Sequence, residues 1–137
     1  MPTSLFVNLA VDDLEKTMAF FGGLGYEFNA QFTNELAACM LIGENIFAML
    51  LTKPHFESFI DRPISNAHES KEVLLALMLD SADEVRELCE KAFALGARRY
   101  KEPEDMGFMF SWGYEDLDGH IWELGWMDPN FVMPTEG

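Results

Sequence analysis

The stretch EDLDGHIWELGW, residues 115–126, decides the fold more than any other part of the chain. Asp118-Gly119 is a strong turn signal, and the residues that follow it alternate as they do in a β-strand. Glu123 lies in the middle of this predicted strand, on the same face as Ile121 and Gly125. A carboxylate is unusual there, so Glu123 either faces water or points into a cavity where it contacts a metal ion or another ligand.

Outward from this stretch, the chain repeats one order of elements: a strand, a helix and three more strands. In the first half the predicted strands are residues 5–11, 26–32, 36–42 and 46–51, with a helix at 14–21. In the second half they are residues 73–79, 97–101, 108–114 and 120–127, with a helix at 85–95. We therefore expect one α+β domain, 1–137, with module one at 4–52, a linker at 53–71 and module two at 72–128.

The composition excludes several classes of function. With 24 acidic and nine basic residues, the formal net charge is −15, which disfavours nucleic acid and anionic membrane surfaces as partners. No apolar run reaches the length of a membrane span. The two cysteines, Cys39 and Cys89, each lie within an apolar pattern, which is typical of buried free thiols. These features predict a cytoplasmic protein.

Two stretches resemble the vicinal oxygen chelate superfamily, which includes glyoxalase I, bleomycin-resistance and extradiol-dioxygenase proteins. They are FVNLAVDDLEKTMAFFGGLGY, residues 6–26, and DLDGHIWELGWMDP, residues 116–129. The second stretch is close to the superfamily's Asp-Pro-Asp-Gly-x-x-x-Glu-Leu ending, with Leu117 where proline is usual. The resemblance implies two βαβββ modules, each a U-shaped antiparallel sheet, around a ligand cavity, and a homodimer. It is a poor guide to the reaction, because the fold hosts unrelated chemistries.

The resemblance also places the four residues that hold a metal ion in metal-bearing relatives. Carried over to this chain, these positions are Phe6, Met49, Leu74 and Glu123. Phenylalanine and leucine have no donor atom, and methionine sulfur is a soft ligand that suits Cu(I) rather than zinc, nickel, iron or manganese. A single carboxylate does not hold a divalent ion, so we expect no metal cofactor, with Glu123 as the only surviving candidate ligand.

Other residues are candidates for contact with an organic ligand. Asn8 shares a face with Phe6 on the first strand and is expected to contact either Glu123 or the ligand. An aromatic alternation that includes Phe108, Phe110 and Trp112 has two interpretations. It packs in a core or a dimer interface, or it forms a flat wall on which a planar ligand stacks.

Two functions of different classes remain open. In the first, the protein is a glyoxalase- or bleomycin-resistance-like binding module that holds a small apolar or aromatic molecule between its modules without metal. In the second, it is an enzyme, either a metal-dependent lyase or dioxygenase, or a metal-free isomerase or lyase. The metal-free version uses Glu123 as the base and Asn8 to orient the substrate, but the sequence offers no obvious electrophile.

Overall fold

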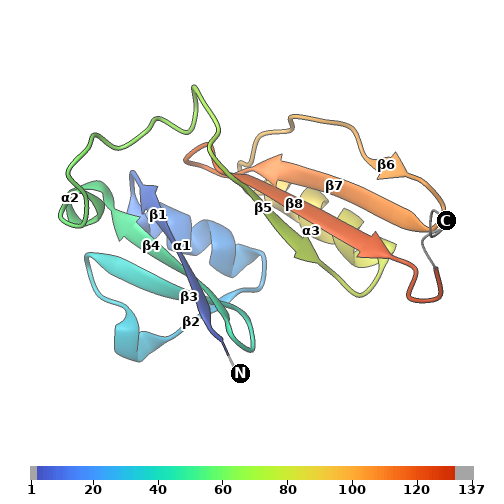
Figure 1. Cartoon of the computed structure of the whole chain (residues 1–137), viewed down its shortest axis with the longest axis horizontal. Helices are drawn as coiled ribbons and strands as arrows, with labels where there is room; N and C mark the ends of the chain where they lie inside the picture. The colour runs from blue at the N-terminus through green and yellow to red at the C-terminus, as the bar shows by residue number, and fades with distance from the viewer. Residues whose placement is uncertain (1–2, 132–137) are drawn as a thin grey trace, which may run out of the picture. The chain divides into compact units, whose positions relative to one another are not determined.

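This computed structural model describes residues 3–131 of the chain, which forms two compact units that divide between Ser70 and Lys71 (Figure 1). Each unit contains one four-stranded sheet and one long helix, as the repeat predicted. The boundary lies at the end of the predicted linker. The two units are described separately below.

The first unit has a sheet in the order β1-β4-β3-β2. Its elements are β1 (Leu5–Val11), α1 (Leu14–Gly23), β2 (Glu27–Phe28), the 3₁₀ helix η1 (Ala30–Phe32), β3 (Ala37–Gly43), β4 (Ile46–Thr52) and α2 (Lys53–Glu57). The carboxylate of Asp13 caps α1 by accepting a hydrogen bond from the backbone N–H of Lys16 at 3.1 Å. Gly25, with a positive φ of 106°, follows the end of the helix.

The core of the first unit lies between α1 and one face of its sheet. Phe20 and Phe21 are the buried aromatic residues of the helix, and Ala48 and Leu50 of the central strand β4 are fully buried. The opposite face of this sheet is called its far face, and it carries Phe6 and Asn8 on the edge strand β1, both exposed. One side of the sheet is therefore buried in the core, and the other is available for contacts.

The second unit repeats this design in the order β5-β8-β7-β6. Its elements are β5 (Leu74–Met78), α3 (Ala82–Ala94), β6 (Glu104–Asp105), β7 (Met109–Glu115) and β8 (Ile121–Met127). The hydroxyl of Ser81 caps α3 by accepting from the backbone N–H of Glu84 at 3.1 Å. Val85, Cys89 and Ala92 form the buried stripe of α3, at the spacing of one helix face.

The sheets are mixed, which corrects the expectation that they are antiparallel. In each unit the helix carries the chain from the first strand to the far edge of the sheet, so the second strand runs in the same direction as the first. Two antiparallel pairings then return the chain, and the last strand lies parallel to the first, β4 beside β1 and β8 beside β5. The crossover helix is the physical reason for the parallel pair.

Two predicted strands are also wrong in extent. The strand predicted at 26–32 is short, because the Asn29 side chain accepts a hydrogen bond from the backbone N–H of Gln31 at 3.0 Å and begins η1. The strand predicted at 97–101 is reduced to one bridge between Arg98 and Glu115, and regular pairing starts only at Glu104.

Two further expectations concern the cysteines and the membrane. Cys39 and Cys89 are both buried and free, as predicted from their apolar surroundings. Burial raises the pKa of both thiols, that of Cys89 to about 12, so both stay protonated and unreactive at neutral pH. Within residues 3–131, no helix is long and apolar enough to cross a membrane.

Candidate functional site

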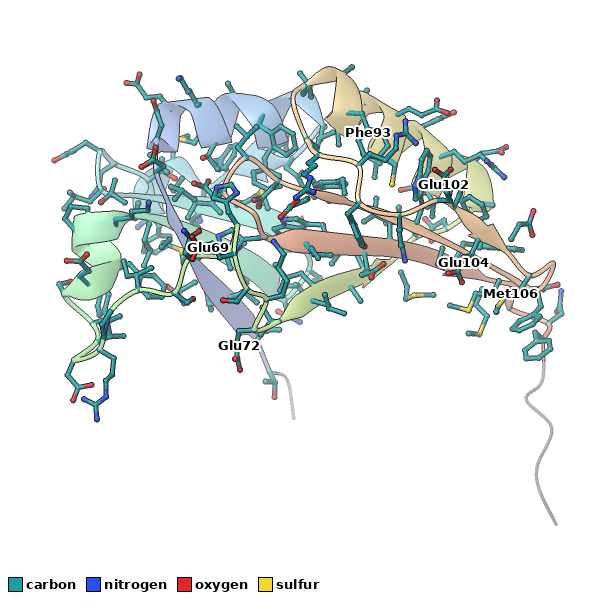
Figure 2. The ribbon with its side chains drawn as sticks, turned by 90° about the horizontal axis from the view of Figure 1, so that it is seen from above. Glu69, Glu72, Phe93, Glu102, Glu104 and Met106 are labelled. Atoms are coloured by element: carbon teal, nitrogen blue, oxygen red, sulfur yellow. The ribbon has the colours of Figure 1, made fainter. Side chains whose placement is uncertain are left out.

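The position of α3 defines the far face of the second sheet. Phe93 of α3 contacts the ring of Trp112 edge-on, with 5.3 Å between the ring centroids, and the guanidinium of Arg86 lies 4.3 Å from the centroid of the Phe110 ring. Figure 2 shows Phe93 on the side of the strands where α3 lies. Even-numbered residues of β7 and β8 share this face because side chains alternate along a strand. Glu123 therefore points to the far face, away from α3.

On the far face, Glu123 is bound to a lysine. The ammonium of Lys101 donates a hydrogen bond to Oε2 of Glu123 at 2.6 Å. The side chain of Lys101 is 26% exposed and that of Glu123 is 23% exposed, so this ion pair is partly withdrawn from water. Glu123 is thus a carboxylate with a charged partner from the protein itself rather than an isolated one.

Lys101 comes from the connection that leads from α3 to β6, and the core fixes the backbone of this segment. The indole N–H of Trp112 donates to the carbonyl of Lys101 at 3.0 Å. Three residues earlier, Arg98 exchanges two backbone hydrogen bonds with Glu115, at 2.8 and 3.0 Å. These two anchors hold Tyr100 and Lys101 beside β7, from where their side chains extend toward Glu123.

Gly113 makes room for this approach. It is the cross-strand partner of Glu123, and a Cβ atom added to it would lie 2.6 Å from the hydroxyl of Tyr100 and 2.6 Å from the carbonyl oxygen of Trp122. Any other side chain at this position would collide with both. Glycine within a strand is typical of such a close approach.

The hydroxyl of Tyr100 is the unusual group of this cluster. It is buried, and among the described residues it has no hydrogen-bond partner of normal geometry. Burial, and then the neighbouring carboxylate of Glu123, raise the pKa of Tyr100 well above its usual value. The phenol therefore stays protonated next to the carboxylate of Glu123, without a hydrogen bond of normal geometry to it.

The far face of the first sheet is apolar by comparison. The rings of Phe6 and Phe47 are stacked with their centroids 4.5 Å apart, and Phe6 remains 49% exposed. Asn8 lies beside Met49 in the parallel pair of β1 and β4. The Asn8 amide donates to the carbonyl of Phe6 on its own strand, at 3.2 Å, in an exposed position.

The other predicted site residues divide between the two faces of the second sheet. Leu74 lies on the far face and is 58% exposed, two residues before Ala76, the parallel partner of Glu123. Phe110 and Trp112 are buried on the α3 face, so core packing, the first interpretation of the aromatic alternation, describes them. Phe108 precedes β7 and stacks on Phe131 with 4.0 Å between the ring centroids.

These residues do not fit a metal ion of the kind that metal-bearing relatives hold. Phe6, Met49 and Leu74 have no oxygen or nitrogen side-chain donor, and an oxygen of Glu123 is taken by Lys101. In the part of the chain that the structure describes, no three His, Cys, Asp or Glu side chains are grouped so that they could hold a metal ion.

The sequence analysis missed the residues that surround Glu123. Tyr100 and Lys101 lie in a segment predicted as a strand, and nothing in a single sequence shows that Lys101 reaches Glu123. Gly113 was the one available signal, because an isolated glycine in a strand pattern suggests that another group approaches closely.

Comparisons with known proteins support the fold. Residues 3–43 match the family described as bleomycin resistance protein-like N-terminal. A hypothetical protein from S. aureus is 28% identical, with a TM-score of 0.76 over 90% of this chain and 93% of that chain. A glyoxalase-related enzyme from Fulvimarina pelagi is 19% identical, with a TM-score of 0.78 over 100% of this chain and 96% of the other.

The resemblance to the vicinal oxygen chelate superfamily is confirmed. A mutant fosfomycin resistance protein from Listeria monocytogenes, solved with Mn(II) and 1S,2S-dihydroxypropylphosphonic acid, shares this vicinal oxygen chelate fold. It is 22% identical, with a TM-score of 0.64 over 90% of each chain. No curated protein matches the sequence significantly. The comparisons accordingly support the fold, and the reaction or ligand has to be argued from the residues.

Proposed function

We propose that this glyoxalase- and bleomycin-resistance-like protein binds a small apolar or aromatic molecule without a metal ion. The observation that carries the proposal is the ion pair between Lys101 and Glu123, 2.6 Å long, at the one family metal position that keeps a donor. The chain already supplies the cation at this carboxylate. The remaining family positions present apolar side chains, which suit an apolar ligand.

The far faces provide the apolar contacts. In the first unit, the half-exposed ring of Phe6 is held in a stack with Phe47 and can pair with a planar ligand. In the second unit, Leu74 and Met78 lie on the far face of β5 and are 58% and 60% exposed. Exposed large apolar side chains on a sheet face are typical of surfaces that bind other molecules.

Metal content tests the first half of the proposal. The purified, untagged protein is incubated with Zn, Ni, Mn and Fe(II), desalted, and measured for metal per chain by mass spectrometry. We expect no stoichiometric metal, and the same result for Glu123→Gln. Occupancy near one metal per chain that Glu123→Gln abolishes would contradict the proposal and would support a lyase or dioxygenase.

Ligand binding tests the second half. A set of small aromatic molecules is titrated against the protein and monitored by thermal shift and ligand-observed NMR. Phe6→Ala is expected to weaken binding of the best ligand about tenfold, because it removes a stacking surface worth roughly 1 kcal/mol or more. Phe32→Ala is the matched control, since Phe32 is also exposed but lies in η1, outside the sheet. Equal losses in both variants would refute a role for the far face.

The enzyme alternative that uses Glu123 as a base has less support. A base must accept a proton from a substrate, and the ammonium of Lys101 occupies Oε2 of this carboxylate. Asn8, its proposed helper, bonds to its own strand instead. A proton-transfer activity that disappears in Glu123→Gln would restore this alternative.

A further inference from the structure

We propose that Lys101 and Tyr100 recognise an oxygen of the ligand, so that the natural ligand is a small apolar molecule with a carbonyl or carboxylate group. This inference rests on the proposed function and adds the chemical class of the ligand. It comes from three features of the second unit: a partly exposed ammonium, a buried hydroxyl without a hydrogen bond of normal geometry, and the apolar side chains next to them.

The ammonium of Lys101 has donors to spare. Lysine carries three N–H donors, and within residues 3–131 the side-chain acceptor of Lys101 is Oε2 of Glu123. The side chain is 26% exposed, so part of it can still be reached from outside. A ligand oxygen that accepts one of the remaining N–H groups forms a charge-assisted hydrogen bond, which is about twice as strong as a neutral one.

Tyr100 supplies a second donor next to the first. Its hydroxyl is buried over Gly113 and lacks an acceptor of normal geometry among the described residues. An incoming oxygen that accepts from this hydroxyl in normal geometry would replace its imperfect contact with the Glu123 carboxylate. Because Tyr100 and Lys101 are adjacent in the sequence and both approach Glu123, one oxygen, or the two oxygens of a carboxylate, can be reached by both donors.

Glu123 acts here as a positioning residue. Its carboxylate holds the ammonium over the far face, which keeps the flexible lysine side chain in one place before a ligand arrives. The row of residues across the sheet at this level is Ala76, Glu123 and Gly113, and two of these have little or no side chain. The hydroxyl of Tyr100 fills the space over Gly113, so the apolar body of the ligand would lie over Ala76, beside the exposed side chains of Leu74 and Met78.

The test uses pairs of probes that differ only in the presence of the oxygen. Acetophenone is compared with ethylbenzene, 2-acetylnaphthalene with 2-ethylnaphthalene, and benzoate with toluene, by ligand-observed NMR on the full chain. We expect the oxygen-bearing member of at least one pair to bind about tenfold more tightly to the wild type, the effect of one charge-assisted hydrogen bond. The benzoate arm distinguishes a carboxylate ligand from a ketone.

Variants then assign the effect to the cluster. Lys101→Met is expected to remove the tenfold preference for the oxygen, measured as the ratio of the two affinities within each pair. Tyr100→Phe and Glu123→Gln are expected to reduce the preference by smaller factors, about threefold. Lys53→Met is the matched control, because Lys53 forms an ion pair with Asp12 on the surface of the other unit. The double variant Lys101→Met/Glu123→Gln leaves no unpaired carboxylate, which separates lost recognition from lost stability.

The possible outcomes separate the two proposals. If both members of every pair bind equally and Lys101→Met changes nothing, the inference is wrong and the proposed apolar binding stands. If no probe of any pair binds, both are wrong. A preference for the oxygen that survives in Lys101→Met and Tyr100→Phe would place the recognition elsewhere and would also overturn the inference.

Discussion

The far faces of the two units have the same architecture, but their polar residue lies on a different strand. The repeat aligns Asn8 with Ala76, Met49 with Glu123, and Cys39 with Gly113, and in each unit these three residues form one row across the sheet. In the first unit the polar residue lies on the edge strand, and the central strands carry methionine and cysteine. In the second unit the edge strand carries alanine and the polar residue is central.

This difference decides how much support each polar group receives. Asn8 at the edge is exposed and can rely on water, so a single hydrogen bond within its own strand is sufficient. Glu123 lies between two neighbouring strands and needs a partner from the protein, which Lys101 provides. At the aligned positions of the first unit, Asn29 and Ala30 begin η1 instead, so a short amide and a methyl group take the places of Tyr100 and Lys101. A repeated fold can therefore place an ion pair such as Lys101–Glu123 in one of its two copies and not in the other.

The largest expected effect on the difference between the two far faces comes from giving Gly113 a side chain. We expect Gly113→Ala to lower the free energy of unfolding by about 3 kcal/mol, because the new methyl group collides with the backbone carbonyl of Trp122 and with the hydroxyl of Tyr100. Urea unfolding followed by tryptophan fluorescence measures the change.

Gly125 is the control for this experiment. It lies on the same far face, but a methyl group there meets the flexible end of Met78, with its sulfur at 3.1 Å, and no other atom closer than 3.5 Å. Gly125→Ala is therefore expected to cost less than 1 kcal/mol, since a flexible side chain can move aside. Equal costs for both variants would show that Gly113 is not required for the approach of Tyr100.

A less severe change removes the partner of the polar group in each unit. Lys101→Met leaves the carboxylate of Glu123 unpaired and mostly withdrawn from water, and we expect a loss of about 1–2 kcal/mol. Asn8→Leu in the first unit is expected to change stability by less than 0.5 kcal/mol, because its hydrogen bond is exposed.

Chemical denaturation of the two single variants checks this ordering. The double variant Lys101→Met/Glu123→Gln should recover most of the loss, since no unpaired charge remains. If Asn8→Leu proved as costly as Lys101→Met, the two far faces would be equally dependent on their polar groups.

The smallest effect concerns a second ion pair of the second unit. Glu115 is buried, which opposes its ionisation, but hydrogen bonds and charges of Lys71 and Arg98 outweigh this and hold its pKa below the ordinary value of 4.5. Because the pKa is lowered in the folded state, the stabilisation is present above 4.5 and is lost as the pH falls through the folded value.

Unfolding measured from pH 6 to pH 3 checks this sign. The wild type should lose stability over this interval more steeply than Glu115→Gln, which has no carboxyl group to protonate. Parallel curves for the two proteins would show that the charge of Glu115 contributes nothing. The first unit has no counterpart for this residue among its ion pairs in the described region, where Lys53–Asp12 and Arg62–Asp61 are both exposed.

Much of the fold could be predicted because its signals are local. The caps before α1 and α3, the glycines after them and the alternation in β8 all depend on residues close in sequence. The mixed sheet was missed because the direction of β4 beside β1 depends on the crossover, not on any strand pattern. Glu123 was singled out by the Asp-Gly turn and the alternation that follows it.

The surroundings of Glu123 could not be predicted in the same way. Lys101 lies 22 residues before its partner, and the pairing depends on the hydrogen bond from Trp112 that holds the carbonyl of Lys101. The side chain of Trp112 is buried on the α3 face of the sheet, and the segment that it holds brings Lys101 to Glu123 on the far face. No periodicity in the sequence indicates that a side chain on one face of the sheet positions a lysine on the other face.

The positive charge beside Glu123 belongs to a lysine of the same chain, so it is permanent. A metal ion at a carboxylate exchanges with solution, so its presence depends on supply and can be reversed by chelators. A lysine held by its own backbone is present at a fixed ratio of one per chain and cannot diffuse away. The positive charge at this position is therefore inherited with the polypeptide and is independent of the metal content of its surroundings.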